Sequence, residues 1–226
     1  SEADAIDALQ YLRPVAYADP FELGDGIRLT FGRAGHILGS ATVQLDLSGD
    51  GPAHRIVFSG DLGRYGMPIV PDPEPPPATT TLLLESTYGD RDHEVTDPRQ
   101  ALGAIVSEVV AKKGVLIVPA FAIGRTQDLL YHLRALQLAG QLPTLPVFVD
   151  SPMACDATPL YLAHGEDHDD EMRRLLREGR RPLEPHALEF ARSVTDSRAL
   201  NDHKGPLIII SASGMATGGR VLHHLA

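Results

Sequence analysis

The chain has 226 residues, of which 43% are hydrophobic and 22% are charged, and its formal net charge is −10. This composition excludes a disordered chain, because it holds enough apolar side chains for one good core or two smaller ones. No stretch approaches the ~18 apolar residues of a membrane span. The single cysteine, Cys155, excludes an internal disulfide and is expected to be a packing residue. We therefore expect a globular, cytoplasmic protein without a membrane partner.

The acidic charge is concentrated in the first part of the chain. Residues 1–96 hold 6 Lys and Arg against 15 Asp and Glu, a net charge of −9, whereas residues 97–226 hold 14 against 15, a net charge of −1. Seventeen of the 20 basic residues are arginine, which can hold phosphate through two parallel hydrogen bonds. This distribution is compatible with metal binding in the first part and phosphate contacts in the second, although solvated surfaces mix charges in the same way.

The first part of the chain has the pattern of one helix followed by strands. A helix over residues 2–12 is expected before Pro14, and a stiff proline-rich connection over residues 71–78. Alternating or short apolar runs predict strands at 27–31, 42–47, 55–58 and 81–84. We assign these elements to a first domain that comprises residues 1–96.

Strands alternate with helices after Asp97-Pro98. The predicted pairs are a strand at 115–118 with a helix from Gly124-Arg125 to about 138, a strand at 146–149 with a helix near 159–164, and a strand at 207–210 with a helix over 220–225. Three such units imply a largely parallel sheet whose loops gather at the C-terminal ends of the strands, where ligands usually bind. Residues 97–226 are therefore expected to form a second, α/β domain.

Three segments place a possible metal ligand just after a predicted strand. They are AGHILGSA with His36, FSGDLGR with Asp61, and LLLESTYGD with Glu85. A carboxylate at the end of a buried strand is costly unless it is paired, and a divalent cation is one such partner. Each residue taken singly is better explained as a turn cap or a polar loop residue.

Together, in this order and at this spacing, the three segments resemble the metallo-β-lactamase superfamily. The likeness is to its β-CASP nucleases, the group that contains ribonuclease J and the endonuclease subunit of the pre-mRNA cleavage and polyadenylation factor. PAFAIGRTQ, DSPMA and SGMATGGRVLHHL are similar to family segments as well, so the resemblance covers nearly the whole chain. It implies an α/β fold, in which part of a metallo-β-lactamase αββα sandwich, residues 1–96, carries an inserted β-CASP domain with a mainly parallel sheet flanked by helices, residues 97–226.

The resemblance also implies roles for the three residues. His36 would bind one metal ion, Asp61 would bridge two, and Glu85 would orient a histidine that acts as an acid; zinc is the expected metal, with two ions. The main family signature, His-x-His-x-Asp-His, is not matched, since no two of the ten histidines have the His-x-His spacing. The last two β-CASP motifs, each a histidine, are expected beyond Ala226. We therefore expect an internal, inactive part of a longer protein.

The glycine-rich segment 211–220 follows a predicted strand and opens a helix, so its backbone N–H groups could hold a phosphate. It lacks the lysine of a Walker A loop and the spacing of a dinucleotide fingerprint, which excludes an NTPase or a Rossmann dehydrogenase. A tight turn is the alternative, and the resemblance favours phosphate binding. The expected substrate-phosphate residues are Arg125, Ser151, Ser213, Gly218, Gly219 and Arg220.

Two histidine clusters are not assigned to the metal. His164 and His168 lie in a highly polar segment, for which a solvated loop is expected. His223 and His224 are neighbours that cannot face one site from a helix, so packing and capping roles are expected.

The function implied by the resemblance is zinc-dependent hydrolysis of RNA, with RNA as the partner and a homodimer as the assembly considered. The β-CASP insertion disfavours a metallo-hydrolase of a small ester, thioester or lactam. A non-catalytic RNA-binding subunit and a DNA nuclease are also compatible with the sequence. The sequence does not distinguish endonucleolytic from exonucleolytic cleavage.

Overall fold

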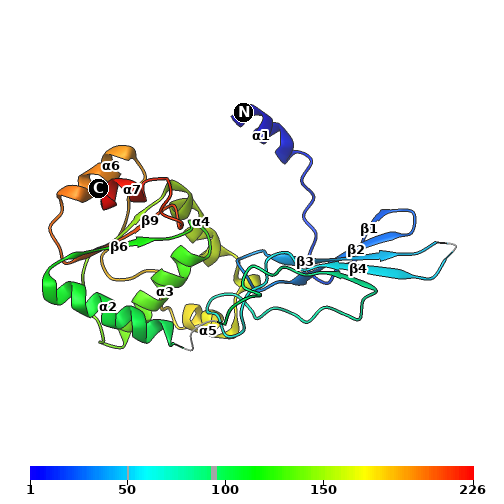
Figure 1. The fold of residues 1–226 in the computed structure, drawn as a ribbon, viewed down its shortest axis with the longest axis horizontal. Helices are drawn as coiled ribbons and strands as arrows, with labels where there is room; N and C mark the ends of the chain where they lie inside the picture. Colours follow the sequence, from blue (N-terminus) through cyan, green and yellow to red (C-terminus); the bar gives the residue numbers. More distant parts are fainter. Residues whose placement is uncertain (50, 93–95) are drawn as a thin grey trace. The chain divides into compact units, whose positions relative to one another are not determined.

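The computed structural model describes residues 1–49, 51–92 and 96–226, which form two compact units (Figure 1). Unit 1 comprises residues 1–65 and 72–89, and unit 2 comprises residues 66–71 and 90–226. The short segment 66–71 thus belongs to unit 2. The predicted domains, with one boundary between residues 96 and 97, did not include this segment in the second domain. No helix in the described part of the chain is long and apolar enough to cross a membrane.

Unit 1 is built on a five-stranded sheet in the order β1-β2-β3-β4-β5. The elements are α1 (Glu2–Leu9), β1 (Phe21–Gly24), β2 (Ile27–Arg33), β3 (Ala41–Leu47), β4 (His54–Phe58) and β5 (Thr81–Leu83). Strands β1 to β4 pair antiparallel, whereas β5 pairs with β4 in parallel, with Val57 opposite Leu82. The four predicted strands are confirmed, and the short edge strand β1 was not predicted. The helix ends three residues earlier than expected.

Unit 2 contains a four-stranded sheet in the order β6-β9-β7-β8, and all its neighbouring strands are parallel. The strands are β6 (Val115–Pro119), β7 (Val147–Asp150), β8 (Leu188–Phe190) and β9 (Leu207–Ser211). The predicted parallel sheet is confirmed, and β8 adds a short edge strand. The C-terminal ends of β6, β7 and β9 lie at the same edge, because Asp150 pairs with Ser211 and Pro119 also pairs with Ser211.

Helices cover both faces of this sheet. They are α2 (Pro98–Lys112), α3 (Arg125–Leu138), α4 (Pro152–Ala163), α5 (Asp170–Arg177), α6 (Val194–Ala199) and α7 (Val221–Leu225), with 3₁₀ turns η1 (Gly165–Asp167) and η2 (Leu200–Asp202). Figure 1 shows α2 and α3 on one face and α6 and α7 on the other. In β9, Ile208 and Ile210 join the core of α2 and α3, whereas Leu207 and Ile209 join the opposite core with Leu200. A strand covered on both faces is apolar throughout, which explains the run of four buried residues before Ser211.

Helix α4 starts earlier than the predicted range 159–164. Ser151 caps its N-terminus and a proline occupies the first helical position, which is a strong start signal. Pro159 lies inside the helix, so the carbonyl of Cys155 receives no bond from a backbone N–H there. Arg192 Nη2 donates to this carbonyl at 3.4 Å instead. Cys155 itself is 1% exposed, as expected of a packing residue.

The solvated loop predicted between α4 and α5 is confirmed for His164, which is exposed, and is wrong for His168. The His168 ring is 0% exposed, and its Nε2 lies within hydrogen-bond distance of the Tyr161 carbonyl. The next residue, Asp169, donates its N–H to the Ile69 carbonyl at 2.8 Å. This contact packs the turn against residues of unit 2 that are distant in sequence, a packing that local polarity does not reveal.

Candidate metal centre and phosphate-binding loops

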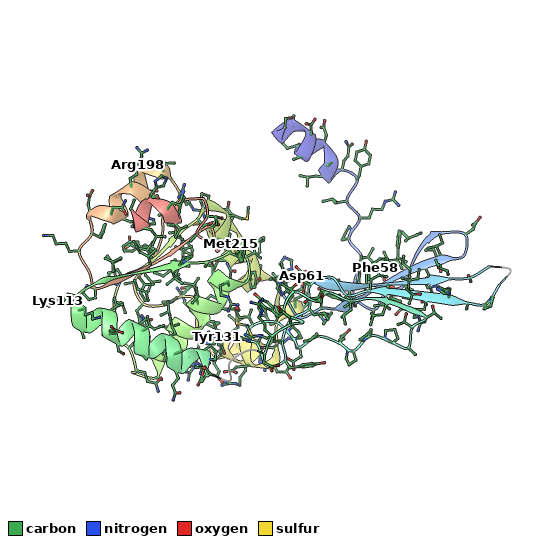
Figure 2. The ribbon with its side chains drawn as sticks, viewed as in Figure 1. Phe58, Asp61, Lys113, Tyr131, Arg198 and Met215 are labelled. Carbon is green, nitrogen blue, oxygen red and sulfur yellow. The ribbon has the colours of Figure 1, made fainter. Side chains whose placement is uncertain are left out.

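His36 and Asp61 lie in two loops of unit 1 that are hydrogen-bonded to each other. His36 lies in the loop after β2, and Asp61 lies just beyond the end of β4 (Figure 2). The N–H of Gly63, in the second loop, donates to the Ala34 carbonyl in the first at 2.8 Å. A Cβ on Gly63 would lie 1.6 Å from the Gly35 carbonyl oxygen, so this close approach requires glycine.

Glu85 lies after β5 and joins a third loop to the second. Its Oε1 accepts a hydrogen bond from the N–H of Leu62 at 3.1 Å, and its Oε2 accepts one from the N–H of Thr87 at 3.0 Å. Its own N–H donates to Ser59 Oγ at 2.9 Å. Hydrogen bonds from Thr87 and Leu62, together with the nearby His36 imidazole, lower the pKa of Glu85. The side chain is therefore an ionised carboxylate at neutral pH, held at both oxygens.

The loops of all three predicted residues, which follow β2, β4 and β5, are thus joined by hydrogen bonds in unit 1. Imidazole and carboxylate are donor types that suit zinc. Across residues 1–49, 51–92 and 96–226, however, no group of three or more His, Cys, Asp or Glu side chains is arranged to hold a metal ion. Zinc sites use about four ligands. His36 and Asp61 therefore fit zinc in donor type, and zinc binding by them stays a prediction.

In unit 2, two predicted phosphate-binding residues lie after β6 and β7. Arg125 is the first residue of α3; its side chain is 56% exposed, and its Nη1 lies 3.9 Å from Asp128 Oδ2. Ser151 is buried, and its Oγ accepts a hydrogen bond from the Ala154 N–H at 3.2 Å. The structure thus shows Ser151 as a helix cap, and contact of either residue with a substrate phosphate stays a prediction.

The predicted glycine-rich loop, residues 211–220, follows β9. Gly219 has φ +78°, and a Cβ there would lie 2.8 Å from the Ala212 carbonyl oxygen, so the turn itself requires this glycine. Gly218 has open space around the position of a Cβ, and Ser213 is partly buried. Gly219 is therefore explained by the tight turn, whereas no steric contact requires glycine at position 218, and phosphate binding by this loop stays a prediction.

A buried ionic cluster lies at the end of β7, and sequence analysis did not assign it. Asp150 is 0% exposed. Its Oδ1 accepts a hydrogen bond from Arg220 Nη1 at 2.8 Å, and its Oδ2 contacts His224 Nε2 at 2.9 Å, Ser197 Oγ at 2.8 Å and Ser211 Oγ at 3.2 Å. Burial raises the pKa of Asp150, but the hydrogen bonds more than offset it, so this pKa lies below its ordinary value. We call these five residues the Asp150 cluster.

The Asp150 cluster gives Arg220 and His224 roles inside the fold. Arg220 Nη1 also donates to the Ala191 carbonyl at 3.1 Å, and Nη2 donates to the Arg192 carbonyl at 2.9 Å. These contacts tie the glycine-rich loop to β7, and phosphate contact by Arg220 stays a prediction. The His224 side chain is 1% exposed and pairs with Asp150, so it does more than pack. The sequence signals for this cluster are a carboxylate at the end of an apolar strand and the family-like segments that contain Asp150, Arg220 and His224.

Comparison with known proteins gives a domain match for part of unit 2 and relatives for nearly the whole chain. Residues 126–226 match the Beta-Casp domain. The chain is 36% identical over 98% of its length to a ribonuclease of Thermus thermophilus, of which it covers 50%. It is 30% identical over 96% of its length to the transcription termination factor FttA of Methanosarcina mazei, covering 34% of that protein. It is also 28% identical over 99% of its length to an RNase J-like protein of Methanocaldococcus jannaschii, covering 51%.

The predicted resemblance to β-CASP nucleases is therefore confirmed: residues 126–226 match the Beta-Casp domain, and the ribonuclease and the RNase J-like protein are similar over nearly the whole chain. The chain spans between about a third and a half of the length of these relatives.

Proposed function

We propose that the complete protein is a zinc-dependent nuclease that hydrolyses phosphodiester bonds of RNA. The family and the names of the ribonuclease and RNase J-like relatives support RNA as the substrate. The observation that carries the proposal is the set of hydrogen bonds that joins the loops of His36, Asp61 and Glu85. Unit 1 would then be part of a metallo-β-lactamase αββα sandwich.

Each of the three residues has a distinct role in this proposal. His36 would bind one zinc ion and Asp61 would bridge two, with the other ligands supplied by the rest of the complete protein. Bound zinc activates water and neutralises charge on the phosphate. Glu85 keeps its charge and has both oxygens held by backbone N–H groups, so its orientation is fixed. It would orient a histidine that gives a proton to the leaving oxygen.

Unit 2 would hold the backbone of the substrate. Arg125 presents an exposed guanidinium at the N-terminus of α3, where the helix dipole also favours an anion. The glycine-rich loop lies at the same edge of the sheet and is tied to β7 by Arg220. The Asp150 cluster would therefore act by keeping this loop in place.

Two substitutions in the complete protein test the metal assignment. Asp61→Ala should abolish RNA cleavage and lower the zinc content, because it removes a bridging ligand. Glu85→Gln should lose cleavage and keep the zinc, because it only changes the group that orients the acid. Asp25→Ala, at an exposed carboxylate between β1 and β2, is the matched control and should change neither. Cleavage is followed on a labelled RNA in a gel, and zinc by elemental analysis.

Wild-type rates for both Asp61→Ala and Glu85→Gln on RNA would refute the proposal. Faster cleavage of a DNA of the same sequence would replace RNA by DNA as the substrate. Hydrolysis of a small ester or lactam in place of either nucleic acid would favour a small-substrate hydrolase. The cytoplasmic location and the homodimer stay predictions.

A further inference from the structure

Unit 2 has an arginine-lined cavity away from the loops described above. It has a volume of about 280 Å³ and is lined by residues of α2, α3, α5 and the turn after α5. Its charged and aromatic lining consists of Arg99, Tyr131, Arg134, Glu171, Arg174 and Arg180. We call it the arginine pocket. Since α3 rises ~1.5 Å per residue, Arg134 lies roughly 13 Å along the helix from Arg125.

The four arginines of the pocket are not equally neutralised. Arg174 Nη1 lies 2.9 Å from Glu178 Oε1, and Arg180 Nε lies 3.1 Å from Oε2 of the same carboxylate. Among the described residues, neither Arg99 nor Arg134 forms an ion pair. The pocket therefore has two arginine charges that no carboxylate of the described chain balances.

Arg134 also has a hydrogen-bond donor for which the described residues provide no acceptor. Its Nη1 lies 3.0 Å from His186 Nε2, an acceptor that brings no negative charge. Its Nε is buried and has no hydrogen-bond partner in the described part of the structure. A buried donor without an acceptor is costly, and one on a charged group more so. An anion in the pocket would supply both the missing acceptor and the missing charge.

Tyr131, the aromatic residue of the lining, carries no charge. The Arg99 guanidinium lies over the Tyr131 ring, 6.0 Å from its centroid. Burial, with the charge of Glu171 and a hydrogen bond to it, raises the pKa of Tyr131 to about 12, so the phenol keeps its proton. Glu171 is the carboxylate of the lining, and it lies 3.8 Å from Arg174. With Glu171 and Glu178 both counted, four arginines face two carboxylates, and an excess of positive charge is left.

We infer that the arginine pocket binds the phosphate of a nucleotide. Arginine forks match phosphate geometry, and the apolar part of the lining offers a surface for the sugar and base, among them Ala135, Leu138 and Leu175. The volume is near the lower end of small-ligand pockets, which suits one nucleotide and excludes a large cofactor. If the proposed function holds, the bound nucleotide is one unit of the RNA substrate. A free nucleoside monophosphate presents the same phosphate, sugar and base and is the alternative ligand.

Helix α3 carries both Arg125, at its first residue, and Arg134 of the pocket. Between them, burial and the charge of Arg99 lower the pKa of His132, the charge of Asp97 opposes this shift, and the charge of Arg125 adds to it. A single strand whose phosphate contacts Arg125 could therefore follow α3 to the pocket.

Binding is measured with the full 226-residue chain in EDTA, so that cleavage does not contribute. The probes are a fluorescent twelve-residue oligouridylate, followed by anisotropy against salt concentration, and uridine monophosphate as competitor. Arg134→Gln and Arg99→Gln should each weaken RNA binding roughly tenfold, because a charge-assisted contact is lost. Each should also reduce the salt slope by about 0.7, the value for one phosphate contact on a single strand.

Two further variants separate a specific pocket from general charge. Arg198→Gln removes an exposed arginine on α6, across the sheet from Tyr131 (Figure 2), and should leave affinity and slope unchanged. Glu171→Gln removes the negative charge of the lining, can still accept the Tyr131 hydrogen bond, and should tighten binding severalfold. A gain of affinity cannot come from misfolding, and circular dichroism checks the fold of each variant.

The outcomes are distinct from those of the nuclease test. Competition by the monophosphate supports a free nucleotide as ligand, and RNA binding without competition supports the RNA backbone. The inference is overturned if neither probe binds, or if Arg134→Gln and Arg99→Gln bind like wild type. Equal losses in Arg198→Gln would also overturn it. Binding in EDTA does not depend on the Asp61 or Glu85 results, so either proposal can fail alone.

Discussion

The Asp150 cluster should be the part of unit 2 that is most sensitive to a single charge. Asp150→Ala removes the carboxylate that faces Arg220 and His224, whose side chains are 20% and 1% exposed. Both groups would then be left in the interior without an anion. It also removes the acceptor for the hydroxyl groups of Ser197 and Ser211.

The expected size of the effect follows from this burial. Removing one partner of a buried ion pair costs about 3–5 kcal/mol, whereas an exposed pair contributes about 0–1 kcal/mol. Asp156 supplies the matched control, since it pairs with Arg192 at 2.6 Å while its side chain is 72% exposed. Asp150→Ala should therefore lower Tm by roughly 10 °C, and Asp156→Ala by no more than about 4 °C.

Thermal unfolding is followed by circular dichroism, because the chain has no tryptophan for fluorescence. The pKa of Asp150 is lowered in the folded state, so its contribution to stability is complete above its ordinary value of 3.8 and is lost as the pH falls through the folded pKa. The stability difference between wild type and Asp150→Asn should thus shrink as the pH falls below 3.8 toward the folded pKa of Asp150. Equal Tm losses for the Asp150 and Asp156 variants, or a difference that does not change with acid, would refute the reasoning.

One glycine substitution in each unit tests how closely its backbone is packed. Gly63→Ala should destabilise unit 1 by at least about 2 kcal/mol, because the new Cβ would lie 1.6 Å from the Gly35 carbonyl oxygen. Gly24→Ala, with open space around it, is its control, and equal unfolding midpoints for the two would contradict this. Gly103→Ala, inside α2, should stabilise by about 1 kcal/mol, since its Cβ would meet Leu136 at an ordinary 3.5 Å. A lower Tm for that variant would show that the contact is not tolerated.

The central strands of both sheets could be predicted because each is a local pattern. The apolar runs of β6, β7 and β9 record burial on both faces, and the helix α3 begins at the predicted Arg125. The edge strands β1 and β8 are three or four residues long and carry no such pattern. The start of α4 was missed because a proline such as Pro159 usually marks the first turn of a helix. Here Pro159 lies inside α4, and the Cys155 carbonyl that it leaves without a backbone N–H accepts a hydrogen bond from Arg192 instead.

The candidate site shows the same division between local and distant information. The positions of His36, Asp61 and Glu85 at strand ends are visible in the sequence, and so is the family. The Asp150 cluster is not visible, because its contacts join residues 47 to 74 positions apart. The sequence around Asp150 does not indicate that Ser197, Ser211, Arg220 and His224 contact its carboxylate.

This convergence also decides which arginines are available to an anion. Net charge counts Arg220 and Arg134 alike, but the first is neutralised by a buried carboxylate at 2.8 Å and the second has a buried N–H without an acceptor among the described residues. An arginine bound to Asp150 would have to break a buried ion pair before it could hold a phosphate, at a cost that a surface contact does not repay. Within the part of the chain that the structure describes, Arg134 and Arg99 have no such pair to break. Phosphate affinity in unit 2 should therefore follow the unpaired Arg99 of α2 and Arg134 of α3, whatever the net charge of −1 in residues 97–226 suggests.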